Sequence, residues 1–253
     1  MTEKDVGSDA SNIQTTSRKV SPGTWLVNGN KKWIGNANRD WIVLFTKGQD
    51  VSEVNAFLLY LDDTKRGFSR RPIQNKGSLR GITNMILDFQ DMEVSEEWRL
   101  PKVRSFRDIA DILSYSRLYV GWLLAGIGLG VYDHTAKYIG KGGRLQFQLV
   151  QQRLVTIMSN VQASLELMAT ITKRLEVGTV TSGQLSLGKS WVSLKIREAA
   201  ALGREVLGCE GLLLQNYLAK AMLDIEAVYT FEGTYEINSL ILARELTGFS
   251  AIK

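Results

Sequence analysis

The pattern that decides the fold changes at the run Phe106-Arg107-Asp108-Ile109-Ala110-Asp111-Ile112-Leu113-Ser114-Tyr115-Ser116. Its residues Ile109, Ile112, Leu113 and Ser116 recur at the three- and four-residue spacing of one helix face. All three prolines of the chain precede this run, at Pro22, Pro72 and Pro101. Because proline breaks helices, its absence afterwards favours long uninterrupted ones. We therefore predict a β part, residues 1–105, followed by a helical part, residues 106–253.

The β part contains short apolar runs with strand character, at residues 41–45, 56–61 and 84–89, separated by Gly or charged turns. Trp25-Leu26-Val27 leads into Asn28-Gly29-Asn30, which predicts a hairpin turn. Helical periodicity then covers residues 117–138, 148–177, 185–207, 214–221 and 236–246. The predicted fold class is α+β multidomain, a β-sandwich or barrel followed by a four-helix-bundle-type domain.

Composition limits the chemistry that the side chains can supply. The chain has 253 residues, one Cys and one His, His134, so a multi-His metal site is excluded and a Ser-His-Asp triad is disfavoured. We predict no metal site and no nucleic-acid partner. We also predict no membrane span, since no apolar run reaches the roughly 18 residues that a membrane-spanning helix needs. The net charge of +5 suits an anionic ligand, but it is equally compatible with an unselected surface.

Four segments carry a resemblance to a known family. They are Thr2–Ser11, the strand-like Gly29-Asn30-Lys31-Lys32-Trp33-Ile34-Gly35-Asn36, Phe147-Gln148-Leu149-Val150-Gln151-Gln152, and Phe231-Glu232-Gly233-Thr234. In their order along the chain and in their residue identities, these segments resemble motifs of the acyl-CoA dehydrogenase and oxidase family of flavoenzymes. Residues 75–80, 182–191 and 247–248 resemble most the plant peroxisomal short-chain acyl-CoA oxidases, in the glutaryl-CoA dehydrogenase-like branch.

The resemblance implies an FAD-dependent oxidation of a short-chain acyl-CoA to the trans-2-enoyl-CoA in fatty-acid β-oxidation. Removing an α-proton from a thioester requires a base and donors to the thioester oxygen. Glu232 matches the family's catalytic base, and its backbone N–H matches one of those donors. The flavin N5 is the implied hydride acceptor, with oxygen as the implied electron acceptor.

The other implied roles also come residue by residue from the resemblance. Substrate contacts fall on Ser8, Arg117 and Gly233, and FAD contacts on Thr2, Trp33, Gly35, Gly208, Gly211, Thr234 and Glu236. Without the resemblance, Glu232 reads as a solvated loop residue, Trp33 as core packing and Arg117 as a surface charge. The family also implies a homodimer or homotetramer. The expected contact faces are the stripe Val150, Leu154, Ile157 and Val161 and a second apolar set, Leu202, Val206 and the run 212–214.

Several departures from the family pattern favour an alternative. The connection 138–147 is about five residues shorter than in the family, and Leu207-Gly208-Cys209-Glu210-Gly211 adds a side chain and a negative charge beside the expected diphosphate. The family's leading helical domain is expected to be missing, and Ser250-Ala251-Ile252-Lys253 is not a peroxisomal signal. The resemblance implies a peroxisomal location, with cytoplasm or mitochondrion as the alternatives. The alternative function is a truncated, catalytically silent scaffold or assembly subunit.

Overall fold

The computed structural model describes residues 1–49, 53–141 and 143–250, so the end of the predicted C-terminal motif, residues 251–253, lies outside the described residues. The chain divides into two compact units, a β unit and a helical unit. The β unit comprises Met1–Lys76 and Arg80–Ile112, and the helical unit comprises Gly77–Leu79 and Leu113–Lys253.

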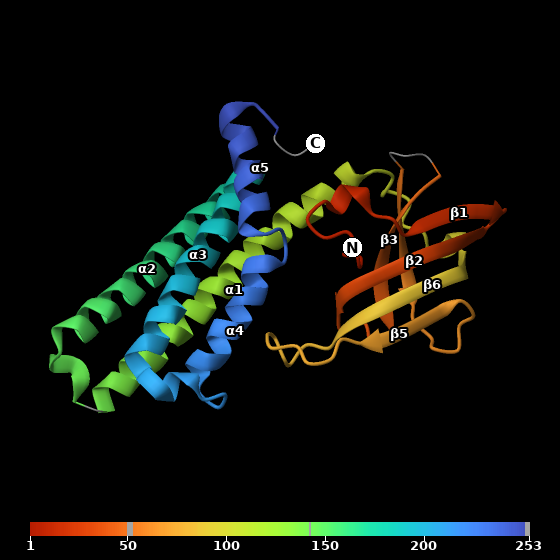
Figure 1. The fold of residues 1–253 in the computed structure, drawn as a ribbon. Helices are drawn as coiled ribbons and strands as arrows, with labels where there is room; N and C mark the ends of the chain where they lie inside the picture. The colour runs from red at the N-terminus through yellow and green to blue at the C-terminus, as the bar shows by residue number, and fades with distance from the viewer. Residues whose placement is uncertain (50–52, 142, 251–253) are drawn as a thin grey trace. The chain divides into compact units, whose positions relative to one another are not determined.

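The β unit is built on one sheet, which contains six strands among the described residues (Figure 1). In chain order they are β1 Thr16–Ser21, β2 Thr24–Gly35, β3 Trp41–Lys47, β4 Val54–Tyr60, β5 Phe68–Pro72 and β6 Asn84–Ser95, with 3-10 turns η1 Ala10–Asn12 and η2 Glu96–Trp98. Their order in the sheet is β4-β3-β1-β2-β6-β5, antiparallel except for the β1–β3 contact. Alternate apolar residues form the core of this unit, including Val27, Leu44, Phe57, Leu59, Leu87 and Phe89.

The predicted hairpin turn at Asn28-Gly29-Asn30 is wrong. Strand β2 runs straight through Gly29, and the chain reverses instead at Pro22-Gly23, since Ser21 pairs with Thr24. A Cβ on Gly29 would lie 2.6 Å from the Cα of Thr15. Gly29 therefore allows Thr15, the residue just before β1, to approach the backbone of β2 closely. In the sequence, a glycine required by a close approach looks the same as a glycine required by a turn.

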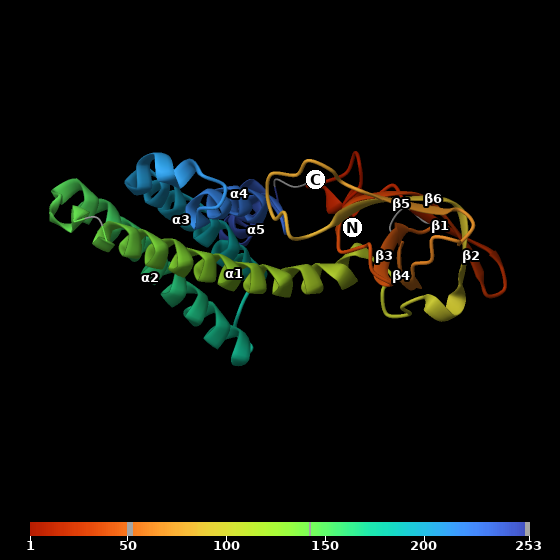
Figure 2. The same ribbon diagram turned by 90° about the horizontal axis from the view of Figure 1, so that it is seen from below.

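The helical unit confirms the change to helical periodicity. Its helices are α1 Phe106–Lys141 (which begins in the β unit), α2 Gln148–Glu176, α3 Ser182–Leu207, α4 Tyr217–Thr230 and α5 Tyr235–Thr247, with η3 Arg144–Gln146 and η4 Gly208–Leu212. Figure 2 shows α1 as one long helix. Helix α4 begins at Tyr217 and not at the predicted residue 214, because the side chain of Asn216 caps it by accepting the N–H of Leu218.

Helix α3 is the centre of this unit and contacts α2, α4 and α5. It begins with a capping box in which Thr181 and Gln184 bond each other's backbone N–H groups. Ile157 and Val161 are both 0% exposed and belong to this core. Half of the stripe predicted as a subunit contact face is therefore used within the chain.

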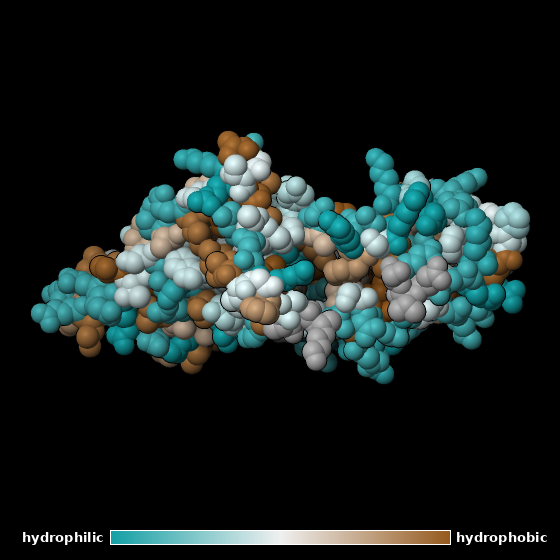
Figure 3. All heavy atoms as spheres, turned by 90° about the horizontal axis from the view of Figure 1, so that it is seen from above, coloured by the Kyte–Doolittle hydropathy of each residue, from teal (hydrophilic) through white to brown (hydrophobic). Residues whose placement is uncertain are grey.

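Hydrophobic side chains also remain on the surface of the helical unit, scattered among hydrophilic ones (Figure 3). Helices α1 and α2 are each long and apolar enough to cross a membrane by length and composition. That evidence is weak, because core helices of soluble proteins pass the same test.

Candidate active site

Glu232 lies in the tight connection between α4 and α5. Its φ is +55° and that of Gly233 is +82°, so two consecutive residues have left-handed backbone. For a residue with a side chain this conformation costs roughly 1–2 kcal/mol. The surrounding contacts must therefore hold Glu232 in place, and non-glycine residues held in this way are concentrated at functional sites.

The carboxylate of Glu232 is hydrogen-bonded to helix α1. The Ser116 hydroxyl donates to Glu232 Oε2 at 2.5 Å and also lies 2.9 Å from the carbonyl oxygen of Leu113. A serine hydroxyl has one proton and two acceptor lone pairs. Ser116 can donate to an ionised Glu232, or donate to Leu113 and accept from a protonated Glu232. The carboxyl group thus has a hydrogen-bond partner before and after it takes up a proton.

Two buried cations accompany this single carboxylate. Arg117 is 9% exposed, and its Nε has no partner within the described residues. Burial lowers the pKa of the Arg117 guanidinium, and Glu232 opposes that effect. Burial also lowers the pKa of Lys189 to about 8, again opposed by Glu232. Buried positive charge of this kind favours negative charge that develops nearby, as on a thioester oxygen during enolisation.

The predicted residues just after Glu232 form the start of α5. Thr234 is its N-cap and accepts the N–H of Ile237 at 3.3 Å. Hydrogen bonds from its own N–H and from the Thr234 hydroxyl lower the pKa of Glu236. This helix N-terminus therefore already carries a negative charge of its own.

Gly208 and Gly211 lie in η4, directly after α3. Gly208 has φ +61° and ψ −132°, a conformation that only glycine adopts readily, and a Cβ on it would meet open space. A Cβ on Gly211 would lie 2.8 Å from the carbonyl oxygen of Arg204, so packing alone requires that glycine. Cys209 and Glu210 between them are exposed.

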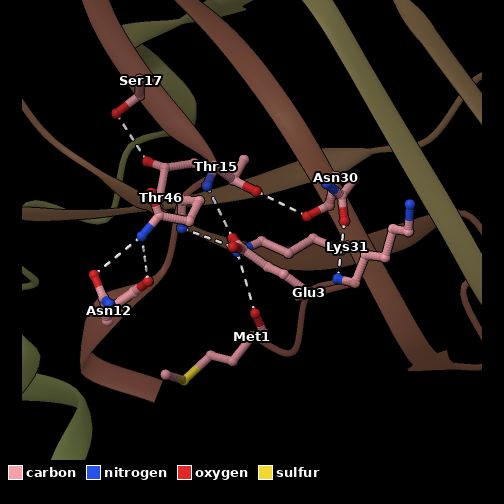
Figure 4. Close-up of polar contacts among 10 residues, drawn as sticks. Met1, Glu3, Asn12, Thr15, Ser17, Asn30, Lys31 and Thr46 are labelled. Carbon is pink, nitrogen blue, oxygen red and sulfur yellow. Dashed lines mark hydrogen bonds and ion pairs between the residues drawn. The ribbon is translucent and has the colours of Figure 1, made fainter. Parts of the chain in front are cut away.

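In the β unit, the segment that contains Thr2 is held to strand β2 by a buried ion pair (Figure 4). Lys31 Nζ lies 2.7 Å from Glu3 Oε1, and the Glu3 carboxylate also accepts the N–H groups of Gln14 and Thr15. Hydrogen bonds from Lys31, Thr15 and Gln14 lower the pKa of Glu3, although burial, the largest single influence, acts to raise it. The carbonyl oxygen of Thr2 accepts a hydrogen bond from the N–H of Lys32 at 2.9 Å. Because Lys32 directly precedes Trp33 in the chain, Thr2 lies close to the backbone of Trp33.

Trp33 lies on an irregularity of β2, where its pairing with β6 shifts between Lys31 and Ile34. Its φ is +66° and it is 49% exposed, so the reading of Trp33 as core packing does not hold in this unit. A bulge of this kind re-aims a side chain. A Cβ on Gly35 would make only an ordinary contact, 3.8 Å from Ile82, and Ser8 is exposed.

The structure thus brings together Glu232, Gly233, Thr234, Glu236 and Arg117 in the helical unit, and Thr2 and Trp33 in the β unit. Gly208 and Gly211 form a separate turn. Three further residues contact the Glu232 turn and were not expected from the sequence: Ser116, Lys189 and Asn238. One signal was present, because Lys189 interrupts a helical stripe of buried apolar residues, Leu185, Val192 and Ile196.

Comparison with known proteins identifies the family. Residues 1–92 match the model of the acyl-CoA dehydrogenase middle domain, and residues 106–247 match that of the acyl-CoA dehydrogenase C-terminal domain. The chain therefore belongs to the acyl-CoA dehydrogenase family, with the expected pair of domains.

Individual relatives are distant in sequence but cover nearly all of the chain. A probable acyl-CoA dehydrogenase, FadE25, of Mycobacterium bovis is 24% identical over 97% of this chain and 65% of its own length. A solved glutaryl-CoA dehydrogenase of Mycobacterium smegmatis superposes with a TM-score of 0.92 at 26% identity, covering 100% of this chain and 65% of that one. A second glutaryl-CoA dehydrogenase structure from Mycobacterium smegmatis, in complex with FADH2, gives a TM-score of 0.94 at 24% identity and covers 66% of that chain. This chain thus spans about two thirds of the length of these relatives.

Proposed function

We propose that this chain catalyses the α,β-oxidation of an acyl-CoA thioester with FAD as cofactor, with Glu232 as the base that removes the α-proton. The observation that carries the proposal is the Glu232 turn itself. A carboxylate sits on a left-handed turn, hydrogen-bonded to Ser116 and accompanied by two buried cations, Arg117 and Lys189. We further propose residues 1–105 and 106–253 as the two domains.

FAD is the cofactor that the comparisons support, and the residues present fit its ring system. The half-exposed indole of Trp33 offers an aromatic face, and the Thr2 segment beside it is fixed by Lys32 and by the Glu3–Lys31 pair. In the helical unit, Gly208 offers open backbone, whereas the exposed Glu210 opposes a diphosphate. When bound, FAD supplies the hydride acceptor that no side chain provides. We propose Thr2, Trp33, Gly35, Gly208, Gly211, Thr234 and Glu236 as its contacts.

On the substrate side we propose Ser8, Arg117 and Gly233 as contacts, and a short acyl chain. We propose oxygen as the electron acceptor, supported by the lack of side-chain crowding at Gly35. The likeness of residues 75–80 and 182–191 to the plant oxidases is the basis for this choice and for a peroxisomal location. Comparing peroxide release with reduction of an electron-transfer flavoprotein separates oxidase from dehydrogenase, and cell fractionation tests the location.

Replacing the base tests the core of the proposal. The change Glu232→Gln keeps the shape of the side chain but cannot accept a proton. We expect the rate of butyryl-CoA oxidation to fall by about 10²–10⁴-fold, with flavin content unchanged. The matched control is Glu166→Gln, an exposed residue on α2 that should leave the rate unchanged. Retention of more than about a tenth of the rate would rule out Glu232 as the base.

The silent scaffold remains the second candidate, favoured by Cys209 and Glu210 at the proposed diphosphate position. A flavin absorbance scan of the purified protein distinguishes the two, because a scaffold would carry no flavin. If flavin is retained weakly, restoring Cys209→Gly and Glu210→Asn together should raise its occupancy. Unchanged occupancy would remove the electrostatic argument.

We also propose that the chain associates into a homodimer or homotetramer. Large apolar side chains remain exposed on the helical unit, including Tyr119 at 74%, Leu149 at 69% and Leu214 at 67%. Exposed apolar area of this kind favours association. Light scattering after size exclusion at micromolar concentration should give a dimer or larger species. A single peak near the chain mass of 28.3 kDa would contradict this.

A further inference from the structure

The backbone of the Glu232 turn is held by two buried side chains from different helices. Lys189, on α3, is 0% exposed, and its Nζ donates to the carbonyl oxygens of Tyr229 at 3.0 Å and Gly233 at 2.6 Å. These two carbonyls lie on either side of Glu232 in the chain. One ammonium group therefore fixes both ends of the turn.

Asn238, on α5, provides the second set of contacts and is also 0% exposed. Its side-chain amide donates to the carbonyl oxygens of Glu232 at 3.3 Å, Gly233 at 2.8 Å and Thr234 at 3.0 Å. A Cβ on Gly233 would lie 2.9 Å from Asn238 Nδ2, so the absence of a side chain there lets the amide reach the backbone. Between them, Lys189 and Asn238 bind the carbonyls of residues 229, 232, 233 and 234.

The position of Lys189 is costly without a specific role. No ion pair joins it to a carboxylate within the described residues. Glu232 and Glu236 act on its charge only at longer range, and its direct partners are neutral carbonyls. Burying an ammonium group without a counter-ion is strongly unfavourable, and an apolar residue of similar volume is often at least as stable. General core stability therefore does not account for a lysine here.

Lys189 and Asn238 bind only carbonyl oxygens of the turn, so the N–H of Glu232 is not engaged by either of them. Across residues 1–49, 53–141 and 143–250, this N–H has no hydrogen-bond acceptor. The peptide unit that carries it lies between the carbonyls of Tyr229 and Gly233, both bound to Lys189. With its flanks fixed, the free N–H keeps one direction, as a donor to a developing oxyanion requires.

We propose that Lys189 is a positioning residue which, with Asn238, holds the left-handed Glu232 turn and so directs both the carboxylate and the free N–H of Glu232. This rests on the proposed function, because the turn matters for catalysis only if Glu232 is the base. The positioning itself is a property of the folded protein and is measurable without turnover.

The test compares Lys189→Met with the wild type by amide hydrogen exchange and by steady-state kinetics. Methionine keeps the volume and removes the donors. The N–H groups that flank the turn and are hydrogen-bonded are those of Phe231, Ile237 and Asn238, bonded to Ala227 and Thr234. We expect their exchange to be about tenfold faster or more, with α2 unchanged. We expect kcat to fall by about 10²-fold, the loss typical of a misdirected oxyanion donor, with KM changed little. Wild-type exchange at the turn, or a normal kcat in the variant, would overturn the inference.

Two further variants complete the design. Lys195→Met is the matched control, since Lys195 lies on the same helix, paired with Glu198 at the surface, and should change neither measurement. If Lys189→Met does not fold, Asn238→Leu removes the second set of donors at similar volume without adding a charge, and is judged by the same criteria. If the wild type does not oxidise acyl-CoA, the proposed function fails, whereas the exchange measurement still decides whether Lys189 holds the turn.

Discussion

The two units each bury a lysine next to a glutamate, but they treat its charge differently. Lys31 is 1% exposed and forms an ion pair with Glu3 at 2.7 Å. Lys189 is 0% exposed and instead donates to two backbone carbonyls, with Glu232 near enough to affect its pKa but not paired with it. In the first arrangement, the ion pair holds the N-terminal segment that contains Glu3 against strand β2. In the second, the lysine binds the backbone on either side of the glutamate, and the glutamate carboxylate is not engaged in an ion pair with it.

The largest effect is expected from breaking the paired lysine. Lys31→Met leaves the Glu3 carboxylate buried without its counter-ion, and removing one partner of a buried pair typically costs about 3–5 kcal/mol. Chemical denaturation should report a loss of that size in the free energy of unfolding. Lys4→Met, an exposed position in the same segment, serves as the control and should change little.

The double variant Glu3→Gln with Lys31→Met should then recover a large part of the loss, because no charge is left unpaired. A double-mutant loss equal to the sum of the two single losses would show that the pair does not act as a unit. In that case the contrast between Lys31 and Lys189 would have no energetic basis.

The next largest effect is expected in the pH dependence of folding stability at alkaline pH, where Lys189 titrates. Burial lowers the pKa of Lys189 from 10.5 to about 8, so the unfolded chain binds more protons between these values. Stability from this group therefore rises as pH increases from about 8 to 10.5. Thermal melts should show the wild type gaining relative to Lys189→Met over that window. Parallel curves would mean that folding does not lower the pKa of Lys189.

The smallest effect is expected at Glu3 on the acid side, because burial and hydrogen bonding shift its pKa in opposite directions. The net pKa is lowered, so its stabilising contribution is present above the usual glutamate range. That contribution is lost as pH falls through the lowered pKa. Melts below about pH 5 should show the wild type losing stability relative to Glu3→Gln. No difference between them would indicate that Glu3 is not held as an anion.

The sequence predicted correctly those elements that depend mainly on the spacing of apolar residues within one segment. The helix pattern after residue 106 predicted the helices of the second unit, since an amphipathic period specifies a buried face. It was a poor guide at Asn28-Gly29-Asn30 and at the start of α4. In the first case Thr15 requires the glycine, and in the second Asn216 fixes the helix start. Each depends on one contact or cap that the apolar pattern does not reveal.

Periodicity along the sequence predicted the two-part organisation, and four short segments carried the family resemblance, which in turn predicted Glu232 as the base. Both predictions depend on features of residues close together in the chain: the spacing of apolar residues and the residue identities within short motifs. Only the tertiary structure decided what surrounds Glu232. Ser116, Lys189 and Asn238 come from three helices, and nothing local marks Ser116 or Asn238 as contacts of residue 232. Helix packing determines which distant donors meet that turn, because it decides which faces are buried together.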